Sequence, residues 1–187
     1  MKTIKTSGLI IQSKPFFEKD RLLVVFTESL GLIRILVKGA QSKSFRYGAK
    51  IEPLTLVDLT LKKGKSFYFL ISIDIQMAFL KLKKNYNCLM FMFYCCDLVK
   101  LVCVYEQVNV LMYDLLCNIC VDLDQLKPIK LLHKQFCVDL LNAEGLYVTN
   151  NDEFSYTEFV RIFTAYAGSV PKLPQFLNTS SLAEEYV

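Results

Sequence analysis

Short apolar runs separated by turn-forming residues fill the first 75 positions of the chain. Residues 54–61, LTLVDLTL, alternate with Thr55, Asp58 and Thr60 as the polar members, a period of two that indicates a half-buried strand. The same reasoning predicts five strands, at residues 4–12, 21–27, 32–37, 54–61 and 67–75. We expect Ser13-Lys14-Pro15 to end the first strand and Gly8 to mark a bulge or bend inside it.

The second half of the chain changes to helical spacing. We predict helices at residues 86–105, 109–123, 129–143 and 155–167, with Gly145 as the C-terminal stop of the third. Ser155, followed three residues later by Glu158, is a capping-box pattern that opens the fourth helix.

Five short strands with a longer connection after the third are typical of a five-stranded barrel of the OB type. The sequence therefore predicts an α+β fold, in which an N-terminal OB-type β-barrel at residues 1–80 is followed by an all-α helical domain at residues 81–187. The composition agrees, because 53% hydrophobic and 21% charged residues supply a packed core and exclude the disordered class.

Charge is distributed unevenly along the chain. Residues 1–84 hold 16 Lys and Arg against 6 Asp and Glu, a net charge of +10, whereas residues 85–187 hold 6 against 12, a net charge of −6. Such asymmetry favours a polyanionic partner for the first half. The alternative interpretation is that the two halves simply attract each other.

The stretch from Gly31 to Gly48 joins a predicted strand to a basic loop. In that loop Lys43, Phe45, Arg46 and Tyr47 interleave cations with aromatic rings, the combination found in sites for single-stranded nucleic acid. The alternative is a solvated loop whose two aromatics pack into the core. The residues that we predict to contact DNA are Lys14, Lys19, Arg21, Arg34, Lys38, Lys43, Phe45, Arg46, Tyr47, Lys62, Lys63 and Lys65.

Several short motifs resemble those of a known family. They are Gln12-Ser13-Lys14-Pro15-Phe16, Glu18-Lys19-Asp20-Arg21-Leu22-Leu23, Val25-Phe26-Thr27-Glu28 with Gly31, and Lys38-Gly39-Ala40. In this order and spacing they resemble the RecO family of bacterial DNA-repair and recombination mediators, with its F-T-x-x-x-G hairpin and K-G-A strand end. The later segment 136–148, FCVDLLNAEGLYV, resembles a helix of the same family, so the resemblance covers residues 1–150.

The resemblance implies a function and a set of partners. RecO-like proteins bind single- and double-stranded DNA, anneal complementary strands, and work with RecR to place RecA on DNA covered by single-strand-binding protein. In that family the acidic, apolar-tipped C-terminal tail of single-strand-binding protein is a further ligand. We place this tail at Lys127, Lys130 and Lys134, of which the latter two lie at i, i+4 on one helix face.

One departure from the family concerns metal binding. Many members carry a four-cysteine zinc site after the helix that matches residues 136–143, whereas residues 146–187 contain no cysteine. Cys117-x-x-Cys120 has no second pair, although structural zinc needs four ligands. We therefore expect no metal site and read these thiols, at i, i+3 on one helix face, as core residues.

Neither a catalytic centre nor a nucleotide-phosphate loop is evident. His133 is the single histidine, and a lone histidine on an amphipathic helix is more often structural than catalytic. The glycines form neither G-x-x-x-x-G-K nor G-x-G-x-x-G. The sequence thus predicts a protein that is not an enzyme and uses no cofactor.

Cysteine usage and hydropathy favour a cytoplasmic protein. No long apolar run follows Met1 to Lys5, so we expect no signal peptide and reduced, buried thiols. The most apolar stretch, residues 88–105, is interrupted by Asp97 and Lys100 and is predicted to be a buried core helix, with no membrane partner. Two other functions fit the same residues: an OB-fold RNA-binding module, and a protein-interaction adaptor without DNA activity.

Overall fold

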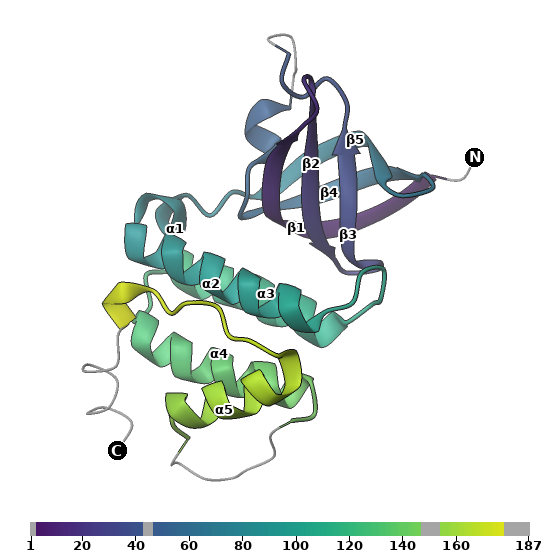
Figure 1. Ribbon diagram of the computed structural model, residues 1–187. Helices are drawn as coiled ribbons and strands as arrows, with labels where there is room; N and C mark the ends of the chain where they lie inside the picture. Colours follow the sequence, from purple (N-terminus) through teal and green to yellow (C-terminus); the bar gives the residue numbers. More distant parts are fainter. Residues whose placement is uncertain (1–2, 43–46, 147–153, 178–187) are drawn as a thin grey trace. The chain divides into compact units, whose positions relative to one another are not determined.

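The computed structural model describes residues 3–42, 47–146 and 154–177. Two compact units make up the chain: Met1–Phe79 with Cys103–Tyr113, and Leu80–Val102 with Asp114–Val187. The first unit contains the strands and the second contains the helices, with the start of one helix in the first unit (Figure 1). The division predicted from sequence assigned residues 103–113 to the helical part, whereas in the structure they group with the strands.

Five strands close into a barrel in the order β1-β2-β3-β5-β4, and β4 returns to β1 (Figure 1). Their bounds are β1 Thr3–Phe16, β2 Asp20–Thr27, β3 Gly31–Val37, β4 Thr55–Lys63 and β5 Tyr68–Met77. The pairing of β3 with β5 is parallel, and every other pairing is antiparallel. The predicted α+β fold with an N-terminal five-stranded OB-type domain is confirmed.

Strand β1 is long because it pairs with two different strands along its length. Its first part, Thr3–Ile10, pairs with β4, and its second part, from Gly8 onward, pairs with β2. The expected bulge lies between Ile10 and Gln12 and not at Gly8. Gly8 instead permits a close approach, since a Cβ atom there would lie 2.7 Å from a methyl group of Val25.

The expectation that Ser13-Lys14-Pro15 ends the first strand is wrong, because β1 continues to Phe16. Pro15 pairs with Arg21 of β2, in a part of β1 that has no second partner strand among the described residues. A proline lacks the N–H that a second neighbour would need, so it is tolerated on an edge.

The hairpin between β2 and β3 explains the F-T-x-x-x-G motif. The Oγ1 atom of the fully buried Thr27 donates to the carbonyl of Gly31 at 2.8 Å and accepts the N–H of Leu30 at 3.2 Å. Gly31 closes the turn with a φ of +67°, a left-handed conformation that favours glycine. The motif residues therefore define the geometry of this turn.

The interior of the barrel is a single apolar cluster. Inward side chains come from all five strands, and Ile51 of the short 3₁₀-helix η1 (Gly48–Ile51) joins them. The central members are Ile10, Leu23, Val25, Ile33, Ile35, Val57, Leu59, Leu61 and Ile73, each at most 2% exposed. This core gives the loops at the barrel ends a rigid support.

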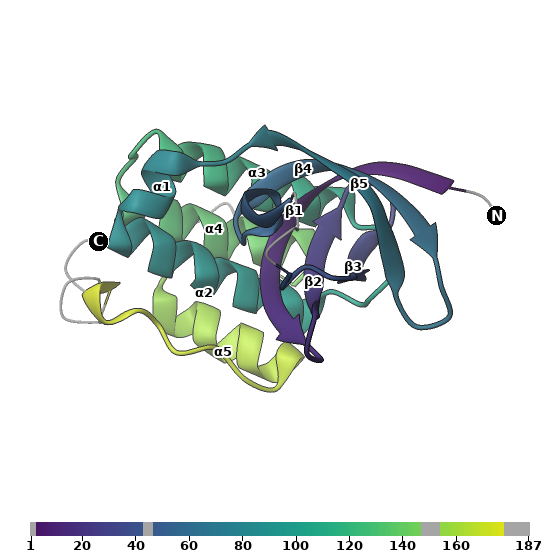
Figure 2. The same cartoon turned by 90° about the horizontal axis from the view of Figure 1, so that it is seen from above.

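The second unit is helical. Its elements are α1 Leu80–Lys84, α2 Tyr86–Val102, α3 Val110–Asp124, α4 Ile129–Ala143, α5 Tyr156–Ala167 and the 3₁₀-helix η2 Gln175–Leu177. Helix α4 packs against both α2 and α5 (Figure 2). The sequence pattern missed α1 and the two 3₁₀-helices, and the helix predicted to reach residue 105 ends at Val102.

Local signals set several helix ends as predicted. The Oγ atom of Ser155 accepts the N–H of Glu158 at 3.2 Å, and Gly168 ends α5 with a φ of +80°. Helix α1 uses a long-range cap, since Asp124 Oδ1 accepts the N–H groups of Lys81 and Leu82. Satisfying these otherwise unpaired N–H groups stabilises a helix start.

The thiols are free, and most are buried as expected. Cys88, Cys95, Cys96, Cys120 and Cys137 lie in the core, whereas Cys103 and Cys117 are partly exposed. Burial raises the pKa of Cys96 to about 12, so this thiol is a poor nucleophile. None of the helices within the described part of the chain is long and apolar enough to cross a bilayer.

Candidate nucleic-acid interface

Hydrogen bonds fasten the β1–β2 turn to the residues that follow β3. The N–H of Gly39 donates to Asp20 Oδ1 at 2.8 Å, and Gln41 Nε2 donates to the Asp20 carbonyl at 2.8 Å. The N–H of Gln41 donates in turn to the carbonyl of Lys19 at 2.9 Å. These bonds hold Lys19 and Lys38, both exposed, at the same end of the barrel.

A row of four phenylalanines crosses this end of the barrel. Phe16 meets Phe17 edge to face, with ring centroids 4.4 Å apart, and meets Phe67 of the β4–β5 turn at 5.7 Å. Phe69 follows two residues after Phe67. We call Phe16, Phe17, Phe67 and Phe69 the aromatic row. The row joins the two turns that bind oligonucleotides in OB-fold proteins.

Phe17 is the outermost member of the aromatic row. Its side chain is 80% exposed, and its backbone adopts a φ of +51°. A left-handed conformation costs roughly 1–2 kcal/mol for a residue with a side chain. An exposed apolar ring on a strained backbone contributes little to folding, so its placement fits a role in binding.

Lysines flank the other end of the aromatic row. Lys38 Nζ lies 5.3 Å from the centre of the Phe69 ring, and Lys62 pairs with Phe69 across the β4–β5 ladder. Gly64 makes room for this ring, since a Cβ atom there would lie 2.5 Å from Phe69 Cε2. Cations beside aromatic faces are the combination that holds a single strand, with phosphates on the cations and bases on the rings.

The remaining predicted contacts lie in several different environments. Lys14 and Lys65 are exposed at the same end of the barrel, whereas Arg21 is partly buried and donates to Ser13 Oγ at 3.0 Å. Arg34 lies over the ring of Tyr105, and Lys63 forms an ion pair with Glu106, so both contact the segment 103–113. Lys43, Phe45 and Arg46 lie outside the described residues, and half-buried Tyr47 packs against the barrel core.

Sequence reasoning missed the aromatic row because it concentrated on the β3–β4 loop. The signal was present in both turns: Phe16 and Phe17 lie between Lys14 and Lys19, and Phe67 and Phe69 follow Lys65. What the sequence lacked was evidence that the two turns meet. Only the barrel closure places them side by side.

A second face of the barrel is unsuited to a polyanion. A groove of about 560 Å³ runs over β1, β4 and β5, and Glu28, Asp58 and Asp74 line it with Lys5 as the one lysine. Asp58 accepts hydrogen bonds from Ser7 and Gln76, which keep its carboxylate in place. Asp74 forms an ion pair with Lys50 at 2.8 Å, but Glu28 and Asp58 remain to repel phosphates, so the aromatic row marks the better candidate for DNA.

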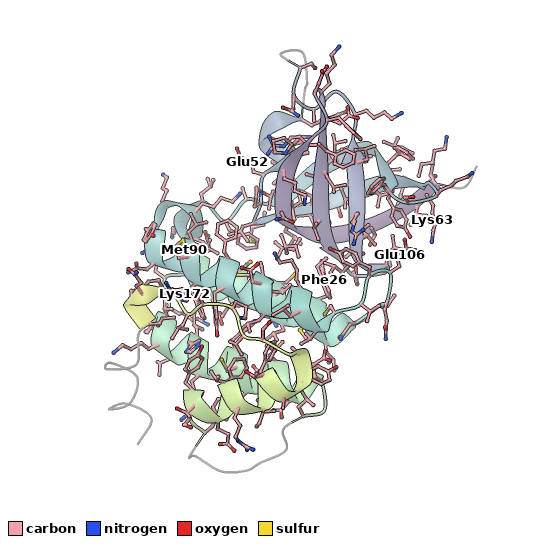
Figure 3. The ribbon with its side chains drawn as sticks, viewed as in Figure 1. Phe26, Glu52, Lys63, Met90, Glu106 and Lys172 are labelled. Carbon is pink, nitrogen blue, oxygen red and sulfur yellow. The ribbon has the colours of Figure 1, made fainter. Side chains whose placement is uncertain are left out.

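The three lysines of the predicted partner site differ in their surroundings. Lys127 Nζ forms an ion pair with Asp122 Oδ1 at 2.6 Å, while Lys130 is exposed and Lys134 half-buried on α4. A separate groove of about 570 Å³ lies in the same unit, between the start of α2 and residues 172–176. Met90 and Lys172 line it and are labelled in Figure 3.

The described residues contain no cluster of metal-ligating side chains, and the single histidine is buried. Within residues 3–42, 47–146 and 154–177, no three His, Cys, Asp or Glu side chains gather closely enough to hold a metal ion. His133 is fully buried against the rings of Phe91, Tyr94 and Tyr156, and burial lowers its pKa to about 4. It is therefore a neutral core residue at physiological pH.

Comparison with known proteins identifies relatives of this chain. Residues 1–79 match the family described as Recombination protein O N terminal. The chain is 30% identical over 113 residues to the DNA repair protein RecO of Alkaliphilus metalliredigens, which covers 60% of this chain and 46% of the relative. It is 26% identical over 148 residues to that of Caldicellulosiruptor bescii, covering 79% of this chain and 61% of the relative.

The chain spans less than two thirds of the length of each of these relatives. The matched region nevertheless includes the whole barrel, in which Thr27, Gly31 and the Asp20–Gly39 contact give structural reasons for the family motifs. Residues 1–79 therefore match the N-terminal domain of the RecO family, and the chain is similar to DNA repair proteins RecO over up to 148 residues.

Proposed function

We propose that this protein is a DNA repair and recombination mediator that binds DNA at the aromatic row and its flanking lysines. One observation carries the proposal: the exposed Lys14, Lys19, Lys38 and Lys65 belong to turns and strand ends that meet at the aromatic row, whose outermost ring, Phe17, is 80% exposed. Phosphate contacts of this kind give affinity without sequence preference, because they read only the backbone of the nucleic acid.

Strand annealing follows from such a surface without any chemical step. Two complementary strands repel each other through their phosphates, and a cationic surface that binds both lowers that repulsion. The protein would thus act by binding and not as an enzyme. We infer further that it works with RecR, binds the tail of single-strand-binding protein, and thereby helps RecA onto coated DNA in the cytoplasm.

The test is charge reversal at the proposed interface. Lys14, Lys19 and Lys65 are exposed, so replacing all three by Glu should leave the thermal unfolding temperature nearly unchanged. Affinity for an oligo(dT) probe should fall strongly, and the slope of log affinity against log salt should become shallower by about 2, since each phosphate contact contributes about 0.7. Annealing of complementary oligonucleotides should fall in parallel.

The matched control reverses three exposed lysines of the helical unit, Lys81, Lys84 and Lys172. It changes the net charge equally but leaves the barrel intact. Equal losses of oligo(dT) affinity in both triple variants would mean that only the overall charge of the protein matters. Competition between DNA and RNA oligonucleotides of equal length addresses the RNA-binding alternative, and an absence of DNA binding at moderate salt would favour an adaptor.

A further inference from the structure

Residues 104–107, which follow α2, lie along the edge of β3. Strand β3 pairs with β5 only at Ile35 and Leu36, so its first half has no β5 partner. There Leu32 forms a parallel bridge with Tyr105, and the N–H of Glu106 donates to the Leu32 carbonyl at 2.9 Å. The fit is close, because a Cβ atom at Gly31 would lie 1.8 Å from the carbonyl oxygen of Gln107.

The side chains of Tyr105 and Glu106 engage two cations of the barrel. The guanidinium carbon of Arg34 lies 4.2 Å from the centre of the Tyr105 ring. Lys63 Nζ lies 2.6 Å from Glu106 Oε2, and the two residues are labelled together in Figure 3. The hydrogen bond to Glu106 raises the pKa of Lys63, so this amine remains charged at physiological pH.

Strand register places these two cations on strands β3 and β4, with β5 between them. Tyr68 pairs with Lys63 on one side and with Ile35 on the other, and Ile35 is the neighbour of Arg34 in β3. The Tyr68 ring is itself 5.5 Å from Lys63 Nζ, and its hydroxyl lies 3.5 Å from Glu106 Oε2. Arg34 therefore meets Tyr105, whereas Lys63 and the buried Tyr68 meet Glu106, the next residue along the chain.

The two contacts have the chemistry of a bound nucleotide. A planar ring over a guanidinium is how a base stacks on an arginine, and a carboxylate on an ammonium replaces a phosphate. We propose that Arg34 and Lys63 form a nucleotide subsite for single-stranded DNA, which Tyr105 and Glu106 cover in the unbound protein and vacate when DNA binds. This inference rests on the proposed DNA-binding function and names a regulated part of it.

The contacts of Tyr105 and Glu106 with the two cations can be replaced by contacts with DNA. The Lys63 and Glu106 side chains are 57% and 48% exposed, so water and salt weaken their attraction. A strand held at the aromatic row presents many phosphates at high local concentration, and these compete with a single carboxylate. The barrel does not have to open, because only one bridge and two surface contacts are exchanged.

Removing the Glu106 carboxylate tests the proposal. The variant Glu106→Gln leaves Lys63 available, so we expect about three- to tenfold tighter binding of oligo(dT) at low salt. The salt slope should be steeper by about 0.7, because the phosphate contact of Lys63 no longer frees a carboxylate that takes up a cation. Asp97→Asn is the matched control: it also removes one negative charge and releases a lysine, Lys100, from a 2.6 Å ion pair, but in the helical unit. Its affinity should equal that of the wild type.

A double-mutant cycle separates the subsite from a merely structural contact. Lys63→Gln should weaken binding less in the wild type, where the phosphate contact only replaces the Glu106 ion pair, than in the Glu106→Gln background, where it should cancel the gain. Unchanged affinity for Glu106→Gln, or a gain that survives Lys63→Gln, would overturn the proposal. If the wild type itself fails to bind oligo(dT), the proposed function fails and not this inference alone.

A direct readout does not depend on affinity. The chain contains no tryptophan, so Tyr105→Trp places a single indole over Arg34. Saturating oligo(dT) should shift its emission to longer wavelength as the ring leaves the barrel for water. An emission maximum that stays constant at saturation would contradict displacement of residue 105.

Discussion

The rings of Phe16 and Phe67 meet edge to face, with centroids 5.7 Å apart, although they belong to different hairpins of the barrel. This contact joins the β1–β2 turn to the β4–β5 turn and so creates a continuous apolar strip between exposed lysines. Together the two turns provide the stacking platform on which the proposed DNA binding depends.

The outermost ring of this platform should contribute to binding without contributing to stability. Because Phe17 is 80% exposed and alanine bears the same left-handed strain at a φ of +51°, Phe17→Ala should leave the free energy of unfolding nearly unchanged. Loss of one stacked base should weaken oligo(dT) binding by about 1–3 kcal/mol in a fluorescence-anisotropy titration. Tyr86→Ala, at a 71% exposed ring of the helical unit, is the control. Equal affinities for Phe17→Ala and wild type would remove the ring from the interface.

Two glycines with the same backbone conformation should differ in how much they tolerate a side chain. Gly31 and Gly39 have φ values of +67° and +66°, but a Cβ atom at Gly39 meets nothing within 4 Å. Gly39→Ala should therefore cost only the conformational strain, roughly 1–2 kcal/mol. Gly31→Ala adds a clash with Gln107 and should cost clearly more in urea unfolding. Similar losses of unfolding free energy in the two variants would show that residues 104–107 move away from the added methyl group at little cost.

Stability should depend on pH through His133. Burial lowers its pKa from 6.5 to about 4 in the folded protein, so between these values the unfolded chain binds a proton that the folded chain does not. The contribution of neutral His133 is complete above pH 6.5 and is lost as the pH falls towards 4, with a slope of up to about 1.4 kcal/mol per pH unit. His133→Phe should flatten the curve between pH 5 and 6.5 in urea unfolding. A wild-type slope that persists in the variant would assign the dependence to other groups.

The proposed site for an acidic peptide tail can be separated from the DNA surface. Reversing Lys130 and Lys134 to Glu should weaken binding of the C-terminal peptide of single-strand-binding protein, measured by calorimetry, and leave oligo(dT) binding nearly intact. Lys172→Glu, in the groove beside Met90, provides the comparison. A loss of peptide binding in Lys172→Glu alone would move the site from α4 to that groove.

The sequence by itself determined the elements and the class of fold. Period-two alternation, turn residues and caps act between near neighbours, so five strands, four of the helices and the Ser155 cap could be predicted locally. The errors lie where a distant partner overrides a local signal. Pro15 remains within β1 because that part of the strand has one neighbour, and the helix predicted to reach residue 105 ends at Val102 because Tyr105 and Glu106 bond to Leu32.

The candidate site was decided by the tertiary structure. The sequence identified the basic half and most of its cations, since charge can be counted without a fold. It did not indicate that Phe16 would meet Phe67, or that Glu106 would cover Lys63, because barrel closure and strand register determine which turns and edges meet. Composition thus specified the kind of partner, and the three-dimensional pairing of remote residues specified where that partner would bind.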